Sequence, residues 1–143
     1  MKLKNIFLCE AATANPDNTF SVLRGGLNIF NIPLQPGVNL SQLPPLHIAL
    51  VATLELEVTE MGRLHNVELV FMDIDGHRVL PEIRLNFQTP MSPKKGGFNL
   101  IANTLLKIPK AGEYCFYINV DGHELGTQQL IVNYLQLAAP QIP

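Results

Sequence analysis

The fold is decided by residues 109–123, which read Pro-Lys-Ala-Gly-Glu-Tyr-Cys-Phe-Tyr-Ile-Asn-Val-Asp-Gly-His. Apolar side chains alternate through Tyr114, Phe116 and Ile118, which is the period-two pattern of a β-strand with one buried face. Asp121-Gly122 follows, and Asp-Gly between two apolar runs is a strong signal for a tight hairpin turn. The stretch therefore predicts a turn, a strand, and a hairpin into a last strand at 127–134.

The same alternation recurs along the chain, whereas helical periodicity is hard to find. In the longest example, every second residue from Leu46 to Val58 is apolar. Residues 98–108 fit both a strand and a helical face, and the neighbouring pattern favours the strand. Eight or nine short strands separated by turns predict an all-β fold, an antiparallel β-sandwich of immunoglobulin-like or C2-like type.

The length of 143 residues is typical of one domain with its own core. We expect a single sandwich domain at 1–136 and a flexible C-terminal tail at 137–143. The first strand is expected at 5–13, and a short strand is expected at 78–80, after the Asp75-Gly76 turn. Residues 33–45 contain four prolines and are expected to form a connection, because proline cannot donate to a strand ladder.

The composition is poor in charge. Charged residues make up 15% of the chain and hydrophobic residues 47%, against a usual charged share of about 25%. A small domain of this kind leaves apolar surface for a partner or for another copy of itself. The net charge of −2 argues against a nucleic-acid partner, which would need clustered Lys and Arg. The chain has no apolar run of the length of a membrane span, so no membrane partner is expected either.

The N-terminus resembles a secretion signal only superficially. The apolar run from Ile6 is interrupted by Glu10, so it is shorter than the roughly 7 to 15 residues of a signal-peptide core. Leu8 stands where a lipoprotein signal would have a small residue. The sequence therefore predicts a cytoplasmic protein in which Cys9 and Cys115 stay reduced, with a disulfide between them as the alternative.

Gly112-Glu113-Tyr114 resembles the penultimate strand of immunoglobulin-like sandwiches. In those sandwiches a tyrosine at this point closes a loop through its hydroxyl, and the resemblance implies the same for Tyr114. Phe116 stands where the disulfide cysteine of an antibody domain would be, and the chain has no tryptophan. An antibody-type domain is therefore excluded.

The chain also resembles a family of small uncharacterised bacterial proteins that is known only as a domain of unknown function. The resemblance covers most of the chain and is carried by residues 7–12, 26–32, 45–52, 73–76 and the 112–122 hairpin. It implies the sandwich fold. It implies no activity, cofactor or site residue.

Two-sided apolarity is the strongest functional signal in this sequence. Tyr117, Ile131 and Leu135 lie opposite the expected core face of the last hairpin, and Val51 lies opposite the core face of its strand. These four residues are the predicted interface, which we expect to be homomeric. The alternative is that the proline-rich connection or the C-terminal tail covers them.

A possible small-anion site lies at residues 93–97. Lys94 and Lys95 precede Gly96 and Gly97, and successive glycine amides beside lysines can form a concave anion nest. Walker spacing is absent, because no Gly-Lys-Ser or Gly-Lys-Thr follows. The alternative functions are therefore a small-anion or nucleotide sensor at this loop, or simply a solvated loop.

Metal and catalytic patterns are weak. Asp73, Asp75 and Asp121 would form a loop-end calcium site only if their loops shared one end of the sandwich. The same aspartates with His77 or His123 are the candidates for a metal-dependent enzyme site. Turn-forming aspartates explain the same residues without a metal. No serine has Gly-x-Ser-x-Gly spacing.

The sequence thus predicts a non-catalytic interaction or assembly module with no cofactor. A metal-dependent enzyme is the remote alternative, and the binding of a small molecule stays open.

Overall fold

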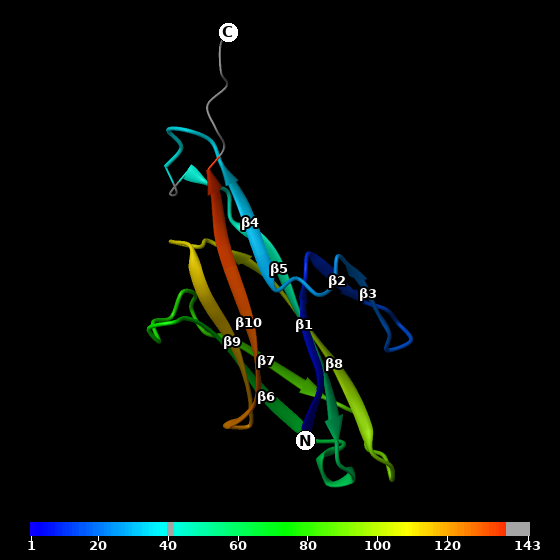
Figure 1. The fold of residues 1–143 in the computed structure, drawn as a ribbon. Coiled ribbons are helices and arrows are strands. Elements are labelled where there is room, and N and C mark those ends of the chain that lie inside the picture. Colours follow the sequence, from blue (N-terminus) through cyan, green and yellow to red (C-terminus); the bar gives the residue numbers. More distant parts are fainter. Residues whose placement is uncertain (40–41, 137–143) are drawn as a thin grey trace.

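The computed structural model describes residues 1–39 and 42–136, which form ten strands in two facing sheets and one extra hairpin (Figure 1). The smaller sheet has the strand order β1-β5-β8. The larger sheet has the order β4-β10-β9-β6-β7. The strands of the smaller sheet are β1 (Lys2–Cys9), β5 (Leu46–Leu56) and β8 (Gly96–Leu106). The strands of the larger sheet are β4 (Ile29–Leu34), β6 (Leu64–Asp73), β7 (Ile83–Gln88), β9 (Gly112–Val120) and β10 (His123–Gln136).

The fold is therefore an all-β sandwich, as the sequence predicted, with ten strands rather than eight or nine. All described pairings are antiparallel except that of β10 with β4, which is parallel. The main core lies between the two sheets and takes Leu50 and Leu54 from β5 and Phe71 and Phe116 from the opposite sheet. The predicted alternation placed these side chains correctly.

The extra hairpin consists of β2 (Ala11–Ala14) and β3 (Phe20–Leu23) and lies over the outer side of the smaller sheet. A second small core forms beneath it. Its buried members are Cys9, Ala12, Ala49 and Val51, with Phe7, Phe20, Val22 and Ile101 packed around them. Two side-chain amides of β8 hold the hairpin in place. Asn99 donates to the carbonyl of Asn18 at 2.7 Å, and Asn103 donates to that of Ala12 at 3.4 Å.

Three strand predictions were wrong in detail. The connection expected at 33–45 begins later, because β4 continues through Pro33 and Leu34, and an edge strand tolerates a proline. Residues 5–13 form parts of two strands, because the chain leaves the smaller sheet at Glu10, whose N–H bonds to Leu23 across the hairpin at 3.0 Å. Residues 78–80 form only an isolated bridge from Arg78 to Met72 and one backbone bond. The ambiguous stretch 98–108 is a strand as favoured over residues 98–106, within β8, and Lys107 and Ile108 lie beyond the end of that strand. The predicted tail at 137–143 lies outside the described residues.

The decisive hairpin has the predicted geometry. Asp121 and Gly122 both have positive φ, 50° and 82°, as a type I′ turn requires. The phenol of Tyr114 is buried and donates to the carbonyl of Lys110 at 2.5 Å, closing the loop that precedes β9. The role that the resemblance implied for this tyrosine is therefore confirmed.

The Tyr114 hydrogen bond can be tested by Tyr114→Phe, which removes one hydroxyl and leaves the Lys110 carbonyl without that partner. We expect the free energy of unfolding to fall by about 1 kcal/mol, because one partly buried hydrogen bond is lost. Urea denaturation measures this loss. Tyr117→Phe is the matched control, since its ring faces away from the core. Equal losses in the two variants would contradict the proposed role of the loop-closing bond.

Candidate functional site

The outer side of the larger sheet carries a group of neighbouring apolar side chains, here called the outer apolar face. Along β9 and β10 the residues Tyr114, Phe116, Leu130 and Val132 point into the core, so the residues between them point outward. The outer apolar face consists of Ile29 and Pro33 from β4, Ile131 and Leu135 from β10, Cys115 and Tyr117 from β9, and Val70 and Met72 from β6.

Strand register makes these side chains direct neighbours. Ile131 pairs with Ile29, Leu135 pairs with Pro33, and Tyr117 pairs with Val70. Ile29 and Leu135 remain 48% and 51% exposed. The face is mixed in character, because the hydrogen-bonded Asn31–Asn133 pair lies between the Ile29–Ile131 and Pro33–Leu135 pairs. Thr127 and Gln129 of β10 pair with Tyr117 and Cys115, and Val70 is already buried. The sequence placed Tyr117, Ile131 and Leu135 correctly on one outward surface.

Val51 does not belong to that surface, and its prediction as an interface residue was wrong. Its side chain is fully buried beneath the β2–β3 hairpin, in the small core with Cys9 and Ala12. The side chains that pack around it are Phe7, Phe20, Val22 and Ile101, from β1, β3 and β8. The sequence showed that both faces of β5 are apolar, but the covering element is a hairpin that packs there through contacts far apart in the chain.

The prediction that the two glycines of residues 93–97 form an anion-binding nest is wrong. Gly96 and Gly97 are strand residues that pair with Leu56 and Glu55, and neither has the positive φ of a nest. Lys95 lies 3.4 Å from a carboxylate oxygen of Glu57. A Cβ at Gly96 would lie 2.4 Å from the Met61 side chain, so close packing accounts for this glycine. Anion binding by Lys94 and Lys95 stays a prediction without a built site.

The predicted combination of three aspartates is also wrong. Asp121 accepts a hydrogen bond from the Asn66 N–H near the start of β6, whereas Asp73 ends that strand. Seven strand residues separate these positions by about 23 Å. Asp73, Asp75 and His77 do bring three ligand atoms within 4.8 Å of one another. However, one oxygen of Asp73 already accepts the backbone N–H groups of Asp75 and His77, which is turn chemistry.

A charged cluster that the sequence did not predict surrounds His65, which is only 4% exposed. Its Nδ1 lies 2.6 Å from a carboxylate oxygen of Asp121, and its Nε2 lies 2.8 Å from the carbonyl oxygen of Glu60. The Glu60 carbonyl and an ionised Asp121 carboxylate both accept, so the imidazolium form of His65, with both ring N–H groups donating, satisfies both partners. The ring also packs against Phe87, with centroids 5.1 Å apart.

The pKa values of this pair follow from the same contacts. Burial disfavours the charged ring of His65, but hydrogen bonds to Asp121 and Glu60 outweigh it and raise the His65 pKa above 6.5. Burial likewise opposes the charge of Asp121, but bonds from His65 and the Asn66 N–H lower its pKa below 3.8. The strand pattern held a signal for this cluster, because His65 shares the inward parity of Val67. Its partner, 56 residues away, was not visible in the sequence.

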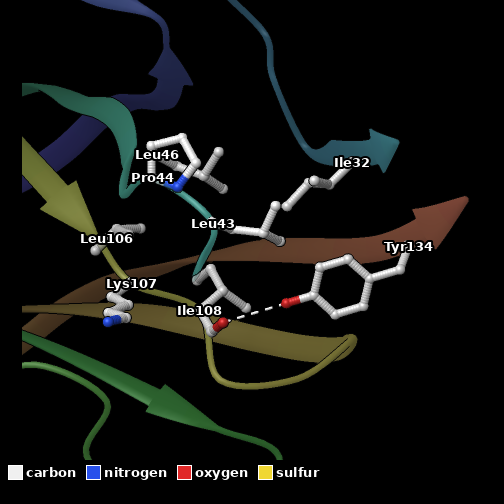
Figure 2. Close-up of a pocket in the computed structure, with 8 residues that line it drawn as sticks. All are labelled: Ile32, Leu43, Pro44, Leu46, Leu106, Lys107, Ile108 and Tyr134. Atoms are coloured by element: carbon white, nitrogen blue, oxygen red, sulfur yellow. Dashed lines mark hydrogen bonds between the residues drawn. The ribbon is translucent and has the colours of Figure 1, made fainter. Parts of the chain in front are cut away.

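An apolar crevice lies at the end of the sandwich that holds the proline-rich connection (Figure 2). Leu43 and Pro44 face Leu106 across it, and the hydroxyl of Tyr134 donates to the carbonyl of Ile108 at 3.2 Å along one wall. The cavity measures about 80 Å³. Ligand sites usually measure about 300 to 1,000 Å³, so this crevice is the size of a single side chain.

A wider groove of about 700 Å³ runs between the hairpin and the smaller sheet, past Asn15 and Phe98. Two of its amide side chains already have partners within the chain. The Asn15 amide donates to Thr19 and Ser21, and the Asn99 amide donates to the carbonyl of Asn18.

Comparison with protein families gives one match, over residues 4–133, to a family of unknown function, DUF6941. The chain belongs to this family. The resemblance to an uncharacterised family is thereby confirmed, and membership of DUF6941 brings no activity or site residue with it. No curated protein matches the chain. Within the described ranges, the chain has no helix with the length and hydropathy of a membrane span.

The His65–Asp121 pair predicts a pH-dependent contribution to stability. The raised His65 pKa gives a contribution that is complete below about pH 6.5 and is lost as pH rises through the folded-state value. The lowered Asp121 pKa gives a contribution that is present above about pH 4 and is lost as pH falls further. The pair therefore stabilises the fold most between about pH 4 and pH 6.5.

Asp121→Asn tests this contribution while keeping a residue that tolerates the positive φ of the turn. We expect a loss of about 1–2 kcal/mol near pH 5.5, discounted because Asp121 is partly exposed, and a smaller loss near pH 8.5. Urea denaturation at both pH values measures it. His77→Gln, at an exposed histidine, is the control. An equal loss at both pH values would rule out the charged pair.

Proposed function

We propose that this protein is a non-catalytic assembly module of the bacterial cytoplasm, and that two copies associate through the outer apolar face. The observation that carries the proposal is the adjacency of Ile29, Ile131 and Leu135, which remain partly exposed on neighbouring strands. Polar side chains lie among them, since Glu113 pairs with Ile131 and Asn133, bonded to Asn31, lies between Ile131 and Leu135. A mixture of apolar and polar side chains is usual in protein interfaces that are not obligate.

A second copy is the partner that fits this surface best. The surface is a regular sheet face, and two such faces pack aligned, as sheets do within a sandwich. A twofold axis places the same residues on both sides, so Tyr117 and Ile131 would each meet apolar side chains of the other copy. No cofactor, metal or nucleic acid takes part in this proposal.

We also favour the immunoglobulin-like form of the sandwich over the C2-like form. Two observations support it: the loop-closing hydrogen bond of Tyr114, and the parallel pairing of β4 with the last strand. The bacterial origin and the cytoplasmic location rest on the sequence alone.

Ile131→Glu tests the proposed interface, because it replaces an apolar side chain of the outer apolar face by a second carboxylate beside Glu113. Burying an unpaired charge is costly, so we expect association to weaken more than about tenfold. Sedimentation over a wide range of protein concentration should give a lower average mass than the wild type. Ile74→Glu is the matched control at an apolar side chain that is 71% exposed elsewhere. A monomeric wild type, or an unchanged mass for Ile131→Glu, would refute the proposal.

A further inference from the structure

The two sheets have four edge strands, and three of them carry the features that prevent unwanted strand pairing. Strand β1 has Lys2 and Lys4 and an irregular register near its start. Strand β4 contains Pro33, which lacks a backbone donor. Strand β7 is six residues long and carries Arg84.

Strand β8 is the exception. It is an edge strand of eleven residues, Gly-Gly-Phe-Asn-Leu-Ile-Ala-Asn-Thr-Leu-Leu, with no charged residue and no proline. It pairs with β5 in unbroken register along its whole length, so it is regular enough to act as a template. Within the described residues, no strand pairs with its other side. The β2–β3 hairpin reaches β8 through the side chains of Asn99 and Asn103 and remains a separate sheet.

We propose that β8 is a second self-association surface, at which two copies pair antiparallel about a twofold axis through Ile101. Ile101 is the middle residue of β8, so this register pairs the whole strand with its copy. The two smaller sheets then join edge to edge into one sheet of six strands. This pairing satisfies the open backbone groups of both edges, which is the general chemistry of strand addition.

The side chains of β8 are complementary to the same strand reversed. In this register Phe98 lies opposite Thr104, Leu100 opposite Ala102, and Gly97 opposite Leu105. Each of these large side chains thus meets a smaller one, and Ile101 meets Ile101 of the other copy on the axis. Asn99 lies opposite Asn103, which matches an amide with an amide. No like charges face each other. This self-complementarity favours a second copy over a foreign peptide, because a foreign strand would have no reason to match it.

This inference is independent of the outer apolar face, because β8 belongs to the other sheet. A protein with both contacts has two different twofold interfaces. If their axes intersect, the assembly closes, as in a tetramer with two kinds of contact. If they do not intersect, the copies form an open chain.

Cysteine cross-linking tests the register directly, in a Cys115→Ser background that leaves only the buried Cys9. Asn99→Cys and Asn103→Cys are prepared separately, mixed and mildly oxidised. In the proposed register, residue 99 of one copy faces residue 103 of the other, within reach of a disulfide. Two residues 99 lie four positions apart, about 13 Å, which is too far.

We expect a disulfide-linked dimer in the mixture, at several times the yield of either variant alone. No dimer in the mixture, or equal yields in all three samples, would overturn the proposal. Circular dichroism checks that each variant is folded, since both substitutions remove a hydrogen bond to the hairpin. Repeating the mixture with Ile131→Glu in both partners separates the two surfaces. A retained cross-link there shows that β8 pairs without the outer apolar face.

A second measurement compares the association of two variants, one of which places like charges on the proposed twofold axis. Ile101→Lys places two ammonium groups opposite each other, whereas in Leu105→Lys each ammonium faces Gly97 of the other copy. We expect Ile101→Lys to weaken association more than tenfold and Leu105→Lys to weaken it less. Equal effects on the average mass in sedimentation would contradict the twofold axis at Ile101.

Discussion

The structure depends on one constraint, which is that strand β5 is apolar on both faces and must be covered on both. Ile48, Leu50 and Leu54 fill the core between the sheets, while Ala49 and Val51 point the other way and are equally buried. A two-layer sandwich covers only one face of each sheet. The chain supplies the second cover by leaving the smaller sheet at Glu10 and folding the β2–β3 hairpin over the outer side.

That cover makes the two sheets unequal. The smaller sheet has its outer face closed by the hairpin, and the hairpin is held by two asparagines of β8 rather than by backbone pairing. The part of the smaller sheet that still lacks a cover is therefore a strand edge. Among residues 1–39 and 42–136, the larger sheet has no comparable cover over Ile29 and Leu135, so its remaining surface is a face. The two proposed contacts follow from this difference, since each uses the surface that the fold leaves open.

Alternation in the sequence predicted which way side chains point, but not what they meet. It placed Tyr117 and Ile131 outward, and it favoured a strand over a helix for 98–108 correctly. It failed at Val51, because the hairpin that covers this residue packs there through contacts that no local pattern encodes. Gly96 was misread for a related reason. In a loop, a glycine usually indicates an exposed backbone that can turn freely. Gly96 instead lies where a Cβ atom would contact the Met61 side chain.

The distribution of cations explains how so weakly charged a chain keeps its strands from pairing at random. Of the ten lysines and arginines, only Lys2, Lys4 and Arg84 lie in strands, and all three are on the edge strands β1 and β7. Positive charge in strands is thus confined to edges, where it prevents pairing. Strand β4 achieves the same with Pro33. An eleven-residue edge that has neither device, in a chain that protects its other edges, is best explained as a strand that is meant to pair.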